Sequence, residues 1–478
     1  MNALQVIKNL LDYGPAVFLS LIMFIIALLV RIKPGRALSA GLTLGVAFTG
    51  MSLVIGFMTS TIAPAGQAMV KNTGLTLTAI DIGWTPVAAI AWAWPFAALM
   101  FPLQIVINFV MFYFGWTRVL NVDMWNVWHK AFIGAAIMIM TGSPLIALVM
   151  CSIWIVLELK SGDLIKNQVQ ALTGIPGVTV THPNMLEIIW MAPLNRLLES
   201  IPFIANLKTS PQELRNKLGF LAENHVLGFF LGILIGIAAG YGIKDTLILA
   251  VKAAACLTLF PMVAQLFMQA LAPISEAASN YMRQKFPGRE FIIGLDWPIL
   301  AGNPTLWTAC ILDIPIILLC AIFIPGNITL PFGSILMTSL AMSATVITQG
   351  DLVRTWLMMA LATPPTFLMA SWFAPLITKM AVETAAFPIP KGATEVTWLA
   401  HNAQYLRWSM IEVGQVAIGK MWPGIIIVPV FIGAYYFYFK EMKRREAAAL
   451  ENIPGHDSGD AGSGDKNAQE APSESAVA

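Results

Sequence analysis

The stretch from Glu290 to Trp307, EFIIGLDWPILAGNPTLW, decides the fold class of this chain. It begins like a membrane segment, but Asp296 stands where the apolar run should continue, and prolines, a glycine and an asparagine follow. A broken backbone at membrane depth is tolerated only where it is buried in protein or lines a wet cavity. An ionisable residue at that depth marks a candidate functional site. The alternative is a cytoplasmic loop in which Asp296 caps the next helix.

The composition is that of a polytopic membrane protein. The chain has 478 residues, of which 57% are hydrophobic and 11% are charged, whereas soluble domains carry about 25% charged residues. The net charge of +2 does not suggest nucleic-acid binding. All four cysteines lie in apolar runs without metal or redox spacing, and no nucleotide-binding, metalloprotease or nucleophile-elbow motif occurs. We therefore predict no catalytic residue, no cofactor and no metal site.

The distribution of basic residues predicts the topology. The loop Arg31–Arg36 follows the first apolar run and is basic, so we place it in the cytoplasm and the N-terminus outside. Lys440–Arg445 follows the last apolar run and places the C-terminus in the cytoplasm. An odd number of spans is required, and we expect an all-α protein of about 11 transmembrane helices. One expected span covers Ala131–Leu157, and another, Leu38–Met58, ends in a polar stretch.

Polar segments divide the chain into four parts. Residues 1–157 form a first half, and residues 158–222 form a cytoplasmic connecting region with an amphipathic stretch at Met185–Ile204. Residues 223–440 form a second half with a final transmembrane helix. Residues 441–478 are polar and low in complexity, so we expect a disordered cytoplasmic tail.

The two halves resemble each other. Ile62-Ala63-Pro64 recurs as Leu271-Ala272-Pro273, 209 residues later (271 − 62). Asp81 and Asp296 each interrupt an apolar run and are followed by tryptophan and proline. The basic loop follows the first span in the first half but the second span in the second half. This reversal predicts an inverted-topology repeat, which is typical of transporters with a site near the membrane midplane.

The candidate site combines carboxylates with aromatic side chains. Carboxylates accept hydrogen bonds from hydroxyl groups, while neighbouring rings offer a stacking surface, a combination that suits polyhydroxylated ligands. Each candidate has a structural alternative: a helix cap for Asp81, an interfacial anchor for His129 and Glu223, and a turn for Asn303. The predicted substrate-binding residues are Asp296, His129, Glu223, Asp81, Trp84, Asn303 and Asn224.

The chain contains four distinctive segments: VDMWNVWH (122–129), ENHVLGFFLGILIGIAAGYGIKD (223–245), FPGREFIIGLD (286–296) and IPGNITLPFG (324–333). Together they resemble the galactitol-type membrane subunit, enzyme IIC (EIIC), of the bacterial phosphoenolpyruvate-dependent phosphotransferase system (PTS). The similarity extends to about Tyr438, with a more distant likeness to ascorbate-type permeases. The chain departs from the family at Gly302-Asn303-Pro304-Thr305, where galactitol permeases continue toward Gly-His-Thr, so the exact substrate stays open.

The resemblance implies a homodimer in the bacterial inner membrane. Each protomer would have a scaffold and a moving core, an elevator arrangement, built from two inverted halves of five spans. The substrate would lie between two re-entrant segments, at residues 79–98 and 291–307, held by His129 and Asp296. By position, the resemblance also favours Asp81, Trp84 and Glu223. A separate enzyme IIB (EIIB), charged by EIIA, would phosphorylate the substrate from a phosphocysteine.

The sequence therefore predicts a PTS permease for galactitol or a related polyol, surrounded by membrane lipid. Whether it counts as an enzyme is uncertain, because the phosphoryl-carrying residues would lie on EIIA and EIIB. The first alternative is an ion-coupled secondary sugar transporter, in which Asp81 and Asp296 bind protons or sodium. A second alternative, a membrane-embedded transferase, would need a catalytic constellation that the sequence does not offer.

Overall fold

The computed structural model describes residues 15–72, 74, 77–123, 125–207, 223–285, 291–331, 333–389, 393–400 and 403–451. These residues are mostly helical, as predicted, but an all-α description is incomplete because short strands accompany the helices. Runs of two to four residues are too short to give an alternating sequence pattern. The strands are β1 (Ala79–Asp81), β2 (Val119–Asn121), β3 (Val178–Val180), β4 (Ile292–Leu295), β5 (Thr329–Leu330) and β6 (Glu395–Thr397).

Each half, taken here as the described residues before 208 and after 222, begins with a 15-residue helix followed by a much longer one. In the first half they are α2 (Pro15–Leu29), α3 (Pro34–Asn72), α4 (Trp84–Trp92), η1 (Ala97–Leu99), α5 (Met100–Tyr113), η2 (Trp125–Val127), α6 (Trp128–Thr141), α7 (Pro144–Thr173), η3 (Pro183–Glu187), α8 (Ile188–Ser200) and α9 (Pro202–Asn206). In the second half they are α11 (Asn224–Ala238), α12 (Ile243–Lys285), η5 (Trp297–Leu300), α13 (Pro304–Phe323), α14 (Thr338–Thr348), α15 (Leu352–Thr384), α16 (Gln404–Val416) and α17 (Gly424–Glu451).

Several of these helices are long and apolar enough to cross a membrane. Among the described residues there are four by length and composition: α7, α13, α15 and residues 424–446 of α17. A fifth candidate is the pair α4 and α5, which is bent by 89° at a short break. The break contains Pro95, whose ring lacks a backbone N–H donor and disfavours a continuous helix. The chain is therefore a multi-pass membrane protein.

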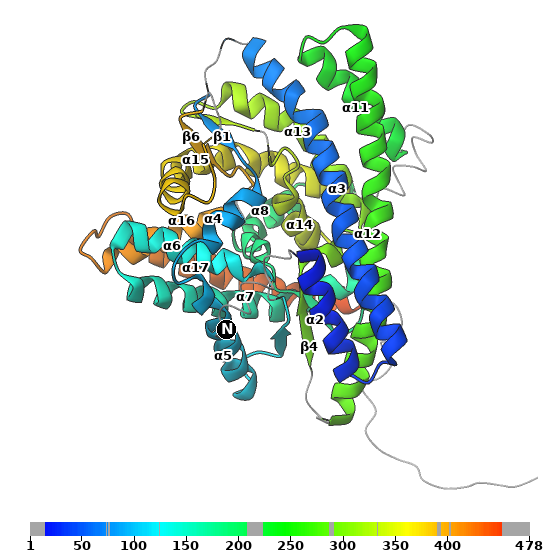
Figure 1. The fold of residues 1–478 in the computed structure, drawn as a ribbon, viewed down its shortest axis with the longest axis vertical. Helices are drawn as coiled ribbons and strands as arrows, with labels where there is room; N and C mark the ends of the chain where they lie inside the picture. The colour runs from blue at the N-terminus through cyan, green and yellow to red at the C-terminus, as the bar shows by residue number, and fades with distance from the viewer. Residues whose placement is uncertain are drawn as a thin grey trace, which may run out of the picture.

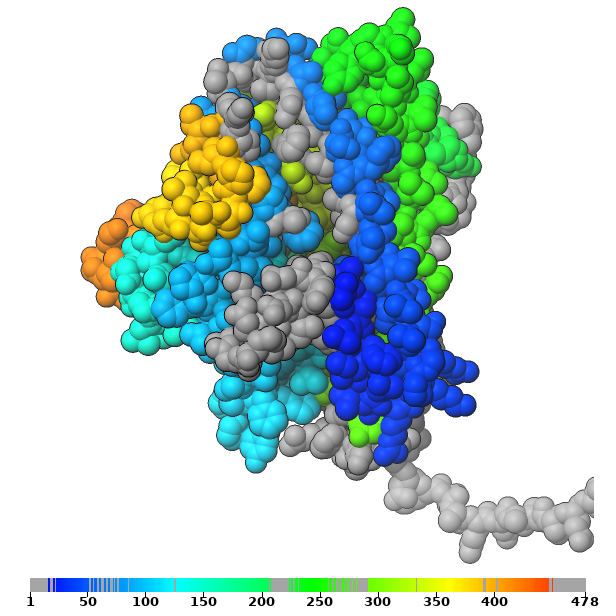
Figure 2. Space-filling view, viewed as in Figure 1, coloured from blue at the N-terminus to red at the C-terminus, as the bar shows by residue number. Residues whose placement is uncertain are grey.

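Two helices from each half form an arm along one side of the molecule. In the arm, α3 lies beside α12, while α2 packs on α3 and α11 packs on α12 (Figure 1). Figure 2 shows the blue and green segments of this arm as a ridge beside the body. The helix that contains the expected span Leu38–Met58 does not end at Met58, because α3 continues to Asn72 through Pro64. The small buried side chain of Ala65 lies in this continuation, where the helix stays packed.

The prediction of a single span at Ala131–Leu157 is wrong, because this stretch divides into two helices, α6 and α7. Gly142 adopts φ 71° at the end of α6, a left-handed conformation that glycine takes without steric cost. Ser143 then caps α7, and its side chain accepts a hydrogen bond from Ile146 N at 3.4 Å. At 14 residues, α6 is about 21 Å long, shorter than the about 30 Å hydrocarbon core of a bilayer. It therefore begins or ends inside the membrane-embedded body.

The proposed segment boundaries cross helices. Helix α7 runs through Leu157 to Thr173, and α17 continues to Glu451, past residue 441. The amphipathic stretch Met185–Ile204 is helical, as η3, α8 and α9. Helix α8 packs on α14, α15 and α17 rather than lying apart from the body. Residues 208–222 of the connecting region and 452–478 of the tail lie outside the described residues.

The strands form two parallel three-stranded sheets, ordered β5-β1-β6 and β2-β4-β3. In each sheet the central strand comes from one half of the chain and its two neighbours come from the other half. Ala79 of β1 pairs with both Thr329 and Glu395, while Gly294 of β4 pairs with both Asn121 and Thr179. The halves therefore exchange their central strands.

Gly294 has no room for a side chain. A Cβ atom there would lie 2.4 Å from Thr181 Cγ2 and 2.9 Å from Val119 Cγ1, on the strands to either side. Thr181 cannot rotate away freely, because its hydroxyl donates a hydrogen bond to Asn121 Oδ1 at 2.9 Å. The exchanged strand β4 therefore requires glycine at this position.

We predict that Gly294→Ala lowers the free energy of unfolding by about 1–3 kcal/mol, the cost of overpacking a closed core. Thermal unfolding of the purified protein in detergent measures the effect. Gly433→Ala is the matched control, because a Cβ atom on Gly433 of α17 meets nothing within 4 Å. Equal melting of Gly294→Ala and wild type would contradict the close packing of β4.

Candidate functional site

Polar side chains gather where the strands of the β2-β4-β3 sheet end. Because these strands are parallel, their carboxyl ends meet at one edge. Asp123 follows β2, His182 follows β3 and Asp296 follows β4. His182 Nε2 lies 4.0 Å from Asp296 Oδ1, and both side chains are largely buried. A residue from the second half thus meets residues from the first half at this edge.

Asn126 connects the two carboxylates of the edge. Its side-chain amide donates to Asp123 Oδ2 at 2.7 Å, and its backbone N–H donates to Asp123 Oδ1 at 3.3 Å. The Asn126 side chain also hydrogen-bonds to Asp296. Asp296 itself accepts a hydrogen bond from Trp297 N at 2.7 Å, which caps η5. The capping alternative for Asp296 is therefore realised, but in a buried cluster rather than in an exposed loop.

His129 lies on α6 within the same cluster. Its ring is stacked on Trp398, with centroids 6.1 Å apart and planes at 12°, and it meets the His182 ring edge-on at 5.1 Å. Arg407 Nη2 lies 2.7 Å from His129 Nδ1. A guanidinium group can only donate, so Nδ1 accepts and the neutral ring carries its proton on Nε2. His129 can therefore present an N–H donor from Nε2.

Arg407 of α16 is fully buried among aromatic rings. Its guanidinium carbon lies 4.8 Å from the Phe132 ring centroid, 5.2 Å from that of Trp398 and 5.6 Å from that of Trp154. Such stacking stabilises a cation where little water reaches. Arg407 therefore fixes His129 and Trp398 together.

A buried ion pair connects the helices around the cluster. Lys130 Nζ lies 2.5 Å from Glu158 Oε2, and Trp154 Nε1 donates to Glu158 Oε1 at 2.6 Å. The pair joins α6 to α7, so His129 stands on a helix whose position is set by charge as well as by packing. Removing one partner of such a pair strands a buried charge.

Asp296 and His182 lie outside the helices that are long and apolar enough to cross a membrane. Burial, followed by the neighbouring Asp123 carboxylate, raises the pKa of Asp296 well above its usual value. Burial, followed by the charges of Lys130 and Arg407, holds the pKa of His182 well below its usual value. Both shifts favour the neutral form. The edge therefore offers neutral donors and acceptors rather than a charged pair.

Two buried polar atoms beside these residues lack a hydrogen-bond partner within the described part of the chain: Trp128 Nε1 and Asn184 Oδ1. Buried polar atoms in native proteins are almost always hydrogen-bonded, and leaving one unpaired costs about 1–3 kcal/mol. Trp128 adjoins His129, and Asn184 follows His182 in η3. One donor and one acceptor are thus available for a ligand's hydroxyl groups.

Asp81 holds the equivalent position in the other sheet, but its carboxylate is already used. It accepts hydrogen bonds from Gly83 N at 3.1 Å, Ser334 N at 2.6 Å, Ser334 Oγ at 3.0 Å and Leu399 N at 3.0 Å. Leu399 follows Trp398, so Asp81 fixes the segment that presents this ring. A direct contact between Asp81 and substrate stays a prediction, and the four bonds favour a positioning role.

The other predicted residues have different surroundings in the described part of the chain. Trp84, the first residue of α4, is partly buried and packs on the core. Asn303 caps α13 by accepting a hydrogen bond from Thr305 N at 2.9 Å. Glu223 is 42% exposed and lies 3.2 Å from His225. Asn224 begins α11, and its side chain lies outside the described residues.

The sequence analysis missed His182, Asn126, Trp398 and Arg407. A signal for His182 exists, because Thr181-His182-Pro183 directly follows the β-branched run of β3. Arg407 stands alone in a segment whose helical pattern was ambiguous. Strand pairing and helix packing together bring these distant residues into one cluster.

Comparisons with known proteins agree with this architecture. Residues 9–392 match the family model described as the PTS system sugar-specific permease component. The chain is 33% identical over 437 residues to the PTS system galactitol-specific EIIC component of Escherichia coli (strain K12), covering 90% of this chain and 94% of that protein. The same values hold for the galactitol-specific EIIC component of Escherichia coli O157:H7. This chain therefore belongs to the family of sugar-specific permease components of the PTS.

Proposed function

We propose that this chain carries galactitol or a closely related polyol across the bacterial inner membrane for phosphorylation by a separate EIIB. The observation that carries the proposal is the buried edge of the β2-β4-β3 sheet. There, Asp296, His129 and His182 present hydrogen-bonding atoms beside the Trp398 ring. EIIB, charged by EIIA, would supply the phosphoryl group, because all four cysteines of this chain are buried.

The electrostatics of the edge favour a neutral polyhydroxylated substrate. A polyol offers several donors and acceptors but no charge, so it matches groups whose pKa shifts favour their neutral forms. A coupling ion would instead be held by an ionised carboxylate. Asp81 does not offer an open carboxylate either, because backbone and serine donors surround it. The ion-coupled alternative is therefore not favoured.

We further propose that the chain contains two inverted repeats of five spans and one final helix, about 11 spans in all. The order of elements supports this, because α11 and α12 begin 209 residues after α2 and α3 (224 − 15 and 243 − 34). Each half then continues through a strand, a broken helical segment, a second strand, a helix pair and a third strand. The basic loops favour an external N-terminus and a cytoplasmic C-terminus.

The division between arm and body supports an elevator mechanism in a homodimer. The arm would remain fixed at the dimer contact, while the body moves with the substrate. Strand exchange ties both halves of the body into one unit, as a rigid moving core requires.

The class of transport can be tested in proteoliposomes containing the purified chain. With phosphorylated EIIB present, we expect labelled galactitol to appear as galactitol phosphate, independently of any proton or sodium gradient. Without EIIA and EIIB, an imposed gradient should not drive accumulation. Gradient-driven accumulation of unmodified galactitol in their absence would contradict the proposal and restore the ion-coupled alternative.

The two equivalent aspartates allow a matched test of the site. We expect Asp296→Asn to weaken galactitol binding roughly 5- to 150-fold, the scale of a lost buried hydrogen-bond partner, with little change in melting temperature. Asp81→Asn should instead lower the melting temperature, because it turns an amide toward backbone N–H donors. Isothermal titration calorimetry and thermal unfolding separate the two effects.

His182→Ala should behave like Asp296→Asn, although His182 was not among the residues predicted to bind substrate. The site would be misplaced if Asp296→Asn and His182→Ala bound galactitol as wild type does. If Asp81→Asn lost galactitol binding while its melting temperature stayed unchanged, Asp81 would be a substrate contact rather than a positioning residue.

A further inference from the structure

A second polar site lies on the outside of the body, where α7 and α17 run in parallel. Ser161 Oγ lies 2.9 Å from Tyr438 Oη, and farther along both helices Asn167 Nδ2 lies 3.5 Å from Glu446 Oε1. Past the buried Glu158, the next charged residue of α7 is Lys160, and the contact between Ser161 and Tyr438 places it within about one helical turn of Lys440, the first charged residue of α17. This level marks a membrane–water boundary.

A groove of about 600 Å³ opens at this boundary, between α7, α17 and the segment after α5. We call it the basic groove. Four of its lining residues are cationic and two are acidic, which leaves a net charge of +2. The cationic residues are Arg118, Lys160, Lys166 and Lys443, and the acidic residues are Asp163 and Glu446.

Two of the lining lysines and the backbone of Arg118 bond to other residues of the groove. Lys160 Nζ donates to the carbonyl oxygen of Trp116, and the backbone N–H of Arg118 donates to Asp163 Oδ1 at 2.9 Å. Lys443 Nζ lies 2.7 Å from Glu446 Oε2, in an exposed pair that water and salt screen strongly. The four cations line one shared opening, where the two acidic residues leave a net charge of +2.

Apolar side chains line the membrane side of the same groove. Val156 and Leu157 precede the cations of α7, while Tyr435 and Phe439 precede those of α17. Val156 and Phe439 are exposed on the surface, and neighbouring side chains of α17 such as Ile432 expose further apolar area. The groove thus combines a cationic end with an apolar end.

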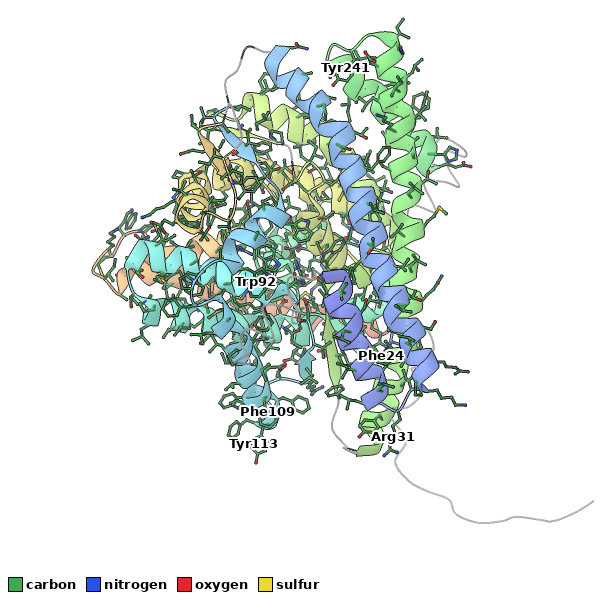
Figure 3. All side chains as sticks on the ribbon, in the orientation of Figure 1. Phe24, Arg31, Trp92, Phe109, Tyr113 and Tyr241 are labelled. Atoms are coloured by element: carbon green, nitrogen blue, oxygen red, sulfur yellow. The ribbon has the colours of Figure 1, made fainter. Side chains whose placement is uncertain are left out.

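Exposed aromatic side chains lead to the groove from α5. Phe109, Tyr113, Phe114 and Trp116 form a chain of ring contacts with centroids 5.3–6.4 Å apart. Figure 3 shows Phe109 and Tyr113 at the free end of α5. Tryptophan and tyrosine concentrate at membrane interfaces, where their rings lie at headgroup level.

We propose that the basic groove binds an anionic phospholipid, with the headgroup phosphate against the cations and an acyl chain along Val156, Leu157 and Phe439. Basic pockets between transmembrane helices are suited to anionic headgroups. A soluble protein partner would reach the cationic end but not the apolar end, which lies on the membrane side. The proposal is independent of the substrate site.

Native mass spectrometry of the delipidated full chain in non-ionic detergent tests the proposal. Phosphatidylglycerol and phosphatidylcholine with identical acyl chains are the probes. Wild type should bind phosphatidylglycerol more tightly. Lys160→Gln/Lys443→Gln should weaken phosphatidylglycerol binding about 10- to 30-fold and leave phosphatidylcholine binding unchanged. The charge-preserving Lys160→Arg/Lys443→Arg should retain the preference, which separates lost charge from misfolding.

Lys33→Gln/Arg36→Gln is the matched control, because it removes two exposed cations from the region between α2 and α3, outside the groove. It should bind both lipids as wild type does. Equal binding of the two lipids by wild type, or an intact preference in folded Lys160→Gln/Lys443→Gln, would overturn the proposal. Full competition by millimolar inorganic phosphate would indicate a site for free phosphate instead. If Lys160→Gln/Lys443→Gln loses EIIB binding but keeps its preference for phosphatidylglycerol, the groove is a protein-docking surface instead.

Discussion

Backbone N–H and C=O groups that leave a helix inside a membrane protein need partners within the protein, because lipid offers none. This chain meets that constraint with two small parallel sheets whose central strands are exchanged between the halves. Neither half can satisfy its broken segments alone, since β1 pairs only with strands of the second half and β4 only with strands of the first. The same exchange brings Asp296 to His182, so the proposed substrate site depends on it.

The two sheets use the same construction with different outcomes. At the end of β1, Asp81 is surrounded by donors from Gly83, Ser334 and Leu399, and it holds the turn before α16. At the end of β4, Asp296 has bonds to Trp297 and Asn126 and faces His182. A carboxyl group can accept about four hydrogen bonds. One aspartate therefore stabilises the fold, while the other retains capacity for a ligand.

The membrane class and the candidate residue Asp296 could be predicted from the sequence, because hydropathy and the broken apolar run around Asp296 are local signals. His129 was a candidate from its place in a tryptophan-rich segment, and the family resemblance also favoured it. The strands could not be predicted, because segments of two to four residues carry no periodicity and their partners lie more than a hundred residues away. For the same reason His182 and Arg407 were missed. The turn at Gly142 was missed because a stretch of apolar residues has the same composition whether it forms one helix or two.

The central claim is that the polyol lies at the edge of the β2-β4-β3 sheet. An electron cryo-microscopy structure of the full chain with galactitol, at a resolution that shows individual hydroxyl groups, tests it most directly. The account predicts ligand density within hydrogen-bond distance of Asp296 and His182 and against the Trp398 ring. The claim would be contradicted by ordered galactitol elsewhere, for example beside Glu223 or in the basic groove, with no ligand density at Asp296.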